Sequence, residues 1–317
     1  MGRCEQAVDV YRQLTVVRQQ RANLCASLAQ YQLVHQVLVE LLVSPSAAVP
    51  AAQLAVRLPQ LKSVADGPSQ LEQQLSFLAS NPPPASYASA RAENLEGKNR
   101  SPEILPEDKS RVFLHSCGLR DNYVNAVFVQ GFKKPDAFIA TEAPLPKRRH
   151  VFWNMVVEKQ SQTVVVMNDL EPDDLRSRVV EPVETLDLTL NVYVNGKMET
   201  SQEVRLFLLP FGDPAGSLPS AEQLVVLHSA YERSLPHSYG GVTTVVCRSG
   251  VTGCGLFIAS SFVMDQLAEE QEIDVVMAVS TVRKSRPQFI GTLKQFELCY
   301  DAALAWLKAF DIYSNFQ

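Results

Sequence analysis

The sequence has no long apolar run, no paired cysteines and no strong excess of either charge. Its 317 residues include six cysteines, and 29 Lys and Arg nearly balance 34 Asp and Glu, for a net charge of −5. No segment approaches the roughly 20 apolar residues that span a bilayer. The scattered cysteines argue against a disulfide scaffold or paired zinc ligands and favour a reducing, cytosolic setting. The mildly acidic charge argues against nucleic acid as a partner.

The two ends of the chain resemble each other. Residues 8–38 align with residues 273–303, and both segments have a helical apolar period, a break and a second helical period. The alignment pairs Asp9 with Asp274, Arg18 with Arg283, Arg21 with Arg286 and Gln30 with Gln295. Chance similarity between amphipathic helices is the alternative, but the shared Arg-x-x-Arg and Gln-aromatic pairs disfavour it.

This repeat predicts the domain organisation, because its copies are separated by most of a domain's length. Residues 1–43 are interpreted as the C-terminal helices of an upstream domain, without a sheet of their own. Residues 44–70, rich in Ala, Pro and Ser, are interpreted as a linker. Residues 71–317 are then one complete domain.

Strand and helix patterns alternate through the main domain. Strands are expected at 122–129, 163–167, 186–194, 204–209 and 243–246, and helices at 71–78, 149–159, 221–233 and 255–268. This pattern indicates an α/β or α+β fold. We expect a twisted mixed sheet with helices on both faces.

One candidate site follows the strand at 243–246. Cys247 ends that strand, a glycine-rich turn follows, and a helix begins near Gly255. Backbone N–H groups of such a turn converge on one point, and the helix dipole adds positive potential there. A cysteine in this position has a lowered pKa and can act as a thiolate nucleophile. By itself the pattern favours the simpler alternative, a buried cysteine before an ordinary glycine turn.

Longer segments resemble the protein tyrosine phosphatases. Residues 98–100 are similar to that family's Lys-Asn-Arg-Tyr loop and residues 122–126 to its Asp-Tyr-Ile-Asn-Ala strand. Residues 138–146 and 152–156 are similar to Phe-Ile-Ala-Thr-Gln-Gly-Pro-Leu-Pro and Phe-Trp-Arg-Met-Val. The resemblance runs from about residue 71 to the C-terminus, through the closing segment 295–300. Residues 1–43 resemble the end of a preceding phosphatase domain, so the chain resembles the second, membrane-distal domain of a receptor-type phosphatase.

The resemblance implies the protein tyrosine phosphatase fold and a set of site residues, with no cofactor and no metal. Cys247 takes the nucleophile position, and Asp213 is the candidate general acid. The substrate-binding positions are Arg248, Ser249, Gly250, Val251, Thr252 and Gly253 of the phosphate loop, Lys98, Asn99, Arg100 and Ser101 of the second loop, and Gln295.

Several positions depart from the family pattern. Gly253 replaces the phosphate-loop arginine, which grips phosphate through two parallel charge-assisted hydrogen bonds. Ser101 replaces a tyrosine that stacks on the substrate, Gly291 replaces a glutamine that positions water, Val246 replaces a histidine, and Asp213 lacks the usual preceding tryptophan. Loss of one preorganised donor costs about 10²–10³ in rate, and loss of a guanidinium costs more. We therefore expect little or no catalysis.

The leading interpretation is a pseudophosphatase: a regulatory domain on the cytoplasmic side of a membrane receptor. It would contact the membrane only through a missing upstream segment. Its expected partners are proteins: the first phosphatase domain of the same or a neighbouring receptor, and phosphotyrosine proteins. The alternative is an active phosphatase that works through a Cys247 thiophosphate. A third interpretation is a redox sensor made of Cys247 and Cys254. The sequence supports it less than the simpler alternative that these are two unrelated buried thiols. If Gly253 is the main defect, Gly253→Arg should restore oxyanion binding before turnover.

Overall fold

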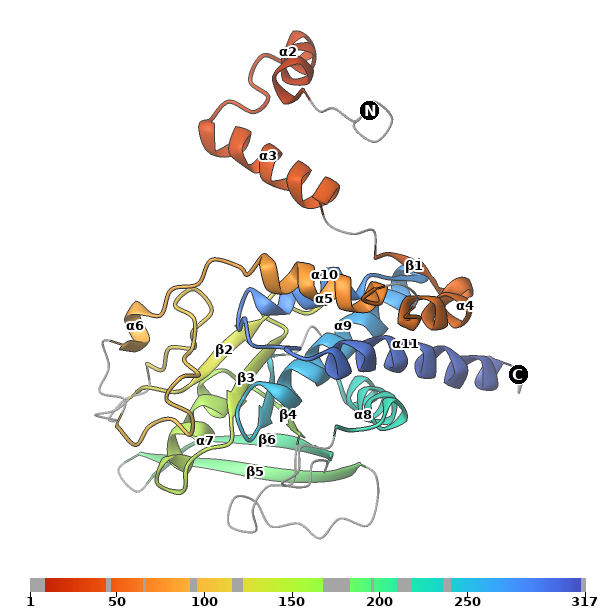
Figure 1. Cartoon of the computed structure of the whole chain (residues 1–317). Coiled ribbons are helices and arrows are strands. Elements are labelled where there is room, and N and C mark those ends of the chain that lie inside the picture. The colour runs from red at the N-terminus through yellow and green to blue at the C-terminus, as the bar shows by residue number, and fades with distance from the viewer. Residues whose placement is uncertain are drawn as a thin grey trace. The chain divides into compact units, whose positions relative to one another are not determined.

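The computed structural model describes residues 9–43, 47–64, 67–91, 96–115, 122–167, 183–194, 197–209, 218–235 and 241–314. The chain divides into two compact units, Met1–Ser46 and Ala47–Gln317 (Figure 1). None of the helices in the described ranges is long and apolar enough to cross a membrane.

The first unit is a helical hairpin made of α2 (Val10–Gln20) and α3 (Leu28–Val43). The Asp9 side chain accepts a hydrogen bond from the Arg12 N–H and caps α2. Arg18 closes the turn between the helices by donating to the carbonyls of Leu24 (3.0 Å) and Cys25 (2.6 Å). Apolar side chains of the hairpin are exposed to solvent, among them Tyr11, Leu28, Leu33 and Val37.

The last two long helices of the second unit repeat these contacts. They are α10 (Val275–Arg283) and α11 (Leu293–Ser314). Asp274 caps α10 through the Met277 N–H, as Asp9 caps α2. Arg283 donates to the carbonyls of Phe289 (2.9 Å) and Ile290 (2.8 Å), which are the positions equivalent to Leu24 and Cys25. The repeat seen in the sequence is therefore also a repeat of hydrogen bonds.

The backbone of the two hairpins agrees as well. Cys25 and Ile290 both adopt left-handed conformations, with φ of 54° and 52°. A positive φ is uncommon for residues other than glycine and is rarer still for a β-branched one. Two such residues at equivalent positions, each held by an equivalent arginine, are not a chance similarity between helices.

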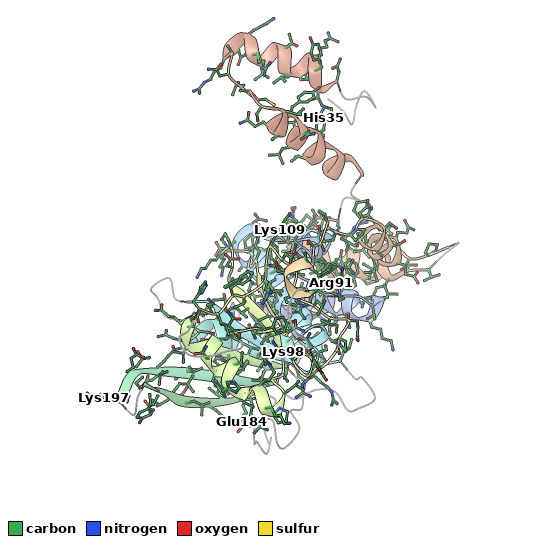
Figure 2. The ribbon with its side chains drawn as sticks, turned by 90° about the vertical axis from the view of Figure 1, so that its left-hand side faces the viewer. His35, Arg91, Lys98, Lys109, Glu184 and Lys197 are labelled. Carbon is green, nitrogen blue, oxygen red and sulfur yellow. The ribbon has the colours of Figure 1, made fainter. Side chains whose placement is uncertain are left out.

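The second unit is built around a six-stranded mixed sheet with the order β2-β3-β7-β4-β6-β5. Its strands are β2 (Ala126–Val129), β3 (Phe138–Glu142), β4 (Thr163–Met167), β5 (Glu184–Val194), β6 (Lys197–Leu209) and β7 (Thr243–Cys247). The four inner strands are parallel, and β2 and β5 are antiparallel edges. Glu184 and Lys197 mark the starts of the two strands of the long β5–β6 hairpin (Figure 2).

Helices cover both faces of this sheet, as expected from the alternating pattern. One face packs against α4 (Ala51–Lys62), α5 (Gln70–Ser80), α8 (Ala221–Ser234), α9 (Thr252–Glu270), α10 and α11. The other face packs against α7 (Arg149–Glu158), which follows the short η1 (Pro146–Arg148). A four-residue helix, α6 (Ala88–Arg91), lies near a small third cluster. The α/β fold is confirmed.

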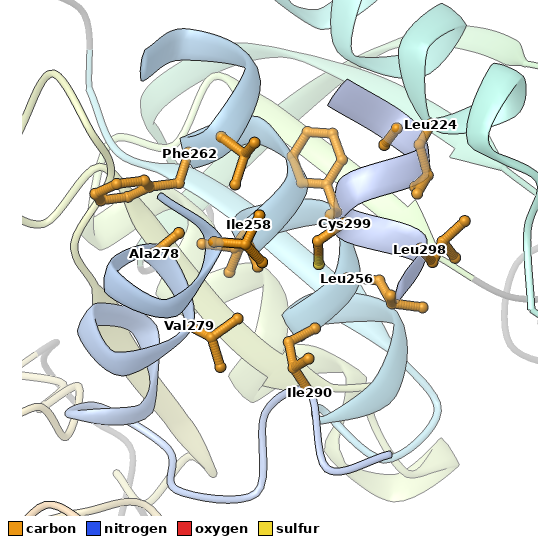
Figure 3. Packing of buried hydrophobic residues seen from close by; sticks show 14 of the residues in the cluster. Leu224, Leu256, Ile258, Phe262, Ala278, Val279, Ile290, Leu298 and Cys299 are labelled. Atoms are coloured by element: carbon orange, nitrogen blue, oxygen red, sulfur yellow. The ribbon is translucent and has the colours of Figure 1, made fainter. Parts of the chain in front are cut away.

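The centre of the larger core is α9, which is buried along nearly its whole length. Figure 3 shows Ile258 of α9 packing with Ala278 and Val279 of α10 and with Cys299 of α11. Because α9 begins at the candidate loop, this packing fixes the direction from which the helix approaches Cys247.

The interpretation of residues 44–70 as a linker needs correction. Val49–Pro50 forms β1 and pairs with β8 (Glu272–Ile273), and α4 follows at once. Leu54, Leu58 and Leu61 of α4 are buried in the core of the second unit, so that unit begins at Ala47 and not at residue 71. The alanine- and proline-rich composition, with Pro59 inside the helix, conceals this apolar period.

Candidate functional site

Cys247 lies where three neighbouring strands end at the same level. In the sheet register it pairs with Glu142 of β3 on one side and with Met167 of β4 on the other. The Ala143 N–H donates to the Cys247 carbonyl at 2.8 Å, so β3 holds the end of β7. Ligand sites of open parallel sheets commonly lie at this carboxyl edge.

The turn after Cys247 requires a glycine. Gly250 has a φ of +70°, and a Cβ there would lie 2.7 Å from the Glu142 nitrogen. Ser249 Oγ accepts from the Val251 N–H at 3.2 Å, and Arg248 is exposed. Thr252 is the first residue of α9. The sequence therefore retains the strand, turn and helix on which an anion loop depends.

The Cys247 thiol is fully buried and its pKa is lowered to about 6. Burial opposes ionisation, but a hydrogen bond from Cys254 Sγ at 3.4 Å and the N–H groups of Cys254, Gly253 and Gly250 stabilise the thiolate more. Burial in turn raises the pKa of Cys254, which keeps that thiol protonated as the donor. Cys247 is therefore largely a thiolate at neutral pH.

Cys254→Ala should raise the pKa of Cys247, because it removes the strongest of the hydrogen bonds that stabilise the thiolate. The measurement is the thiolate ultraviolet absorbance against pH, with Cys247→Ser in each background subtracted to isolate this group. Cys299→Ala, which removes a buried thiol that bonds to Gln295 instead, is the matched control and should leave the titration unchanged. An unchanged pKa in Cys254→Ala would contradict the assigned cause.

Gly253 occupies the position of the arginine, and its surroundings leave no room for a side chain. A Cβ on Gly253 would lie 2.6 Å from Met167 Cβ and 2.9 Å from Cys247 Cβ. Contacts this short do not occur between real Cβ atoms, and neither partner can rotate away, because a Cβ is fixed to its backbone. The start of α9 thus packs directly against β4, and no side chain can leave the backbone at 253 without moving one of them.

A buried cation that the sequence reasoning missed lies behind the loop. Arg286 is 1% exposed, and its Nη2 donates to Asn125 Oδ1 at 2.9 Å. Its Nε and Nη1 have no hydrogen-bond partner, and Nη1 lies 3.1 Å from the ideal Cβ position of Gly250. The signal that could have identified it is the repeated Arg-x-x-Arg, whose second arginine is Arg286.

Glu142 is the acidic partner of this region, at a position where the family pattern has glutamine. Burial raises its pKa to about 7, although the Arg100 N–H and the positive charge of Arg286 favour the carboxylate. The Arg100 N–H lies 3.2 Å from both carboxylate oxygens. Glu142 therefore links the loop at 98–101 to the back of the Cys247 loop.

Glu142→Gln should change how stability depends on pH. Because the folded state raises this pKa from 4.5 to about 7, stability from Glu142 is fully present below pH 4.5 and is lost as pH rises through 7. The amide variant should lack this loss and be more stable at pH 8 by up to about 3 kcal/mol. Urea unfolding between pH 4.5 and 8 measures it, with exposed Glu199→Gln as control. If the free energy of unfolding changed with pH in the same way for wild type and Glu142→Gln, the raised pKa of Glu142 would be contradicted.

The second predicted loop is close to the first. Arg100 Nε donates to the Ala143 carbonyl at 2.7 Å, and Tyr123 Oη donates to Asn99 Oδ1 at 3.0 Å. Lys98 Nζ lies 5.7 Å from the centre of the Tyr123 ring, and Ser101 is half-buried. The cavity beside Lys98, Tyr123 and Glu142 measures ≈ 20 Å³, which is room for about one water molecule.

Gln295, another predicted site residue, forms its observed hydrogen bonds with Thr292 at the start of α11. Gln295 Oε1 accepts from the Thr292 N–H at 3.3 Å, and Thr292 Oγ1 accepts from the Gln295 N–H, so this pair caps α11. Ser27 and Gln30 make the same reciprocal pair before α3. Asp213 lies outside the described residues.

The comparisons with known proteins agree with this geometry. The sequence profile described as "Protein-tyrosine phosphatase" matches residues 95–179 and 185–305, which is more than half of the chain. The chain belongs to the protein-tyrosine phosphatase family. The relatives that it resembles include receptor-type phosphatases. It is 29% identical to "Receptor-type tyrosine-protein phosphatase F" of Homo sapiens over 98% of the chain and 18% of that protein.

Two other relatives have similar sequence identity to the chain and also match nearly all of it. "Tyrosine-protein phosphatase Lar" of Drosophila melanogaster is 28% identical over 98% of the chain and 17% of its own length. "Receptor-type tyrosine-protein phosphatase alpha" of Homo sapiens is 27% identical over 100% of the chain and 43% of its own length. The chain spans less than half of each of these relatives.

Proposed function

We propose that this chain is a pseudophosphatase region of a receptor-type tyrosine phosphatase. It keeps the phosphatase fold but lacks residues that phosphate hydrolysis requires. The observation that carries the proposal is Gly253. The arginine that would hold phosphate is missing, and the backbone there packs against Met167 at a separation that leaves no room for a side chain. A buried thiolate at Cys247 can attack phosphorus only if the phosphate is held in line with it.

Arg286 does not substitute for the missing arginine. Its guanidinium lies behind the loop, bonded to Asn125, and the turn at Gly250 stands against its Nη1. To reach a phosphate in front of the loop, this fully buried cation would have to leave Asn125 and pass the backbone. Its charge supports the Cys247 thiolate from behind but offers no bidentate grip on a substrate.

Active phosphotyrosine hydrolysis is the second candidate function, and the lowered pKa of Cys247 favours it. Calorimetric titration with tungstate, an oxyanion that mimics phosphate, separates the two candidates. The pseudophosphatase proposal predicts no saturable binding at millimolar tungstate by the wild-type chain. Saturable binding that Gly250→Ala abolishes would favour an active phosphatase, because that substitution disrupts the turn of the anion loop and its contact with β3.

We also propose that the first unit is the end of a preceding phosphatase domain. The equivalent arginine contacts and left-handed residues in the two hairpins support this proposal. The relatives match 98% of the chain, which includes most of the first unit. If the proposal is correct, residues 47–317 alone should unfold at the same urea concentration as the full chain. A clear loss of stability on removing residues 1–46 would mean that the hairpin belongs to the second unit.

The remaining role of such a module is binding to proteins. We propose the preceding phosphatase domain of the same or a neighbouring receptor as the partner, since the α2–α3 hairpin exposes the apolar side chains of Tyr11, Leu28, Leu33 and Val37. Sedimentation of the chain with that domain, which carries its own sheet, measures the association. A failure to associate at micromolar concentrations would reject this partner.

A further inference from the structure

A second group of ionisable side chains lies away from Cys247, where α8 and α9 meet the loop between β2 and β3. His228 and Glu232 are one turn apart on α8, and Asp265 is on α9. One nitrogen or oxygen ligand atom from each of the three lies within 4.8 Å of the other two. Lys133 of the loop places its Nζ 3.1 Å from both Glu232 Oε1 and Asp265 Oδ1. A fourth carboxylate, Glu269, lies 3.9 Å from the same Nζ.

The ring of His228 is fixed and points into this group. The residue is 1% exposed, and its Nδ1 lies 3.2 Å from Ser261 Oγ. Its Nε2 faces Glu232 Oε2 at 3.6 Å and Asp265 Oδ1 at 3.8 Å. A metal-binding histidine usually has one ring nitrogen held by a hydrogen bond, while the other points at the metal and its carboxylate ligands.

Asp265 supplies an atom without a hydrogen bond. Its Oδ1 is fully buried, and the Lys133 ammonium at 3.1 Å neutralises its charge outside hydrogen-bonding geometry. A buried carboxylate oxygen without a donor is costly unless a cation satisfies it. Asp265 Oδ1, which is buried and accepts no hydrogen bond, therefore faces the same cation position as His228 Nε2, 3.8 Å away.

We propose that His228, Glu232 and Asp265 form a site for a divalent transition-metal ion such as Zn²⁺ or Co²⁺, with Lys133 as the competing resident cation. One imidazole and two carboxylates are a ligand set that Zn²⁺ accepts, with bonds of about 2.0–2.2 Å. Ligand atoms around such an ion lie roughly 3.4 Å apart, so the two histidine distances are already close to those needed. The metal would bind once the Lys133 side chain, which is 45% exposed, swings into solvent.

A bound metal would join α8 to α9 across the face of the core, and a fourth ligand could be Glu269 or water. The competing explanation is a permanent ion-pair cluster in which Lys133 never leaves. The two explanations differ in what happens when the lysine charge is removed. A metal site should then bind its ion more tightly, whereas an ion-pair cluster should only lose stability.

The experiment titrates the full chain with Co²⁺ and follows visible absorbance and melting temperature. Lys133→Ala should bind one Co²⁺ at least about tenfold more tightly than wild type and melt at a higher temperature when Co²⁺ is added. Adding Glu232→Gln to Lys133→Ala should weaken binding by at least about tenfold, since it removes a ligand. Glu222→Gln, an exposed carboxylate on the same helix, is the matched control and should change nothing.

The spectrum also excludes the cysteines as ligands, because nitrogen and oxygen ligation lacks the intense sulfur-to-cobalt charge-transfer band. If Lys133→Ala does not fold, Lys133→Gln and the wild-type titration give the same comparison. Absence of Co²⁺ binding in both Lys133 variants, or binding that Glu232→Gln leaves unchanged, would overturn the proposal.

Discussion

Gly253→Arg is expected to lower the free energy of unfolding by about 1–3 kcal/mol or more, and not to create an oxyanion site. The sequence alone predicted the opposite, recovery of anion binding once the guanidinium returned. The structure changes this expectation because a Cβ at 253 would lie 2.6 Å from Met167 Cβ. Any side chain there must push α9 away from β4. This movement would also carry the N–H groups of the loop away from Cys247, so that they no longer converge on a bound oxyanion.

A pair of glycine substitutions separates this steric effect from a general cost of replacing glycine. Gly253→Ala should be destabilising with no charge added. Gly291→Ala should be tolerated, because its Cβ would meet only the Gln288 carbonyl at 3.5 Å. Urea unfolding measures stability, and tungstate titration measures binding. A stable Gly253→Arg variant that binds tungstate would show that the loop can open and that the arginine alone was missing.

Arg283→Met is expected to cost about 2–4 kcal/mol of folding free energy. It leaves the buried carbonyls of Phe289 and Ile290 without their donor, and each unsatisfied group costs about 1–3 kcal/mol. Ile290 holds a left-handed backbone with φ of 52°, which this arginine helps to maintain. Lys284→Met, the exposed neighbour, is the control. Equal unfolding midpoints for the two variants would contradict the role assigned to Arg283.

Much of the fold could be predicted from the sequence, because its strands and long helices have clear apolar periods. The strand at 163–167 has the predicted bounds, and the Cys247 turn lies between the predicted strand and helix. The repeat was visible because the same hydrogen bonds need the same residue types at the same spacing. Helix α4 was missed because alanine and proline conceal its three buried leucines.

The properties of the site that depend on distant neighbours could not be predicted. The sequence shows that Gly253 is not arginine, but only the register of β4 and β7 shows that Met167 closes the space. Likewise, the pKa of Glu142 depends on its burial and on the positive charge of Arg286, which comes from another part of the chain. Gln295 caps α11 together with Thr292, and its predicted role in substrate binding stays a prediction.

The most direct test of the central claim is the turnover of a phosphotyrosine peptide by the purified full chain, with Cys247→Ser measured beside it. The proposal predicts that the two proteins release phosphate at the same background rate at every pH from 5 to 8, even though Cys247 ionises near pH 6. Turnover by the wild-type chain well above that of Cys247→Ser, rising as the thiolate forms, would contradict it.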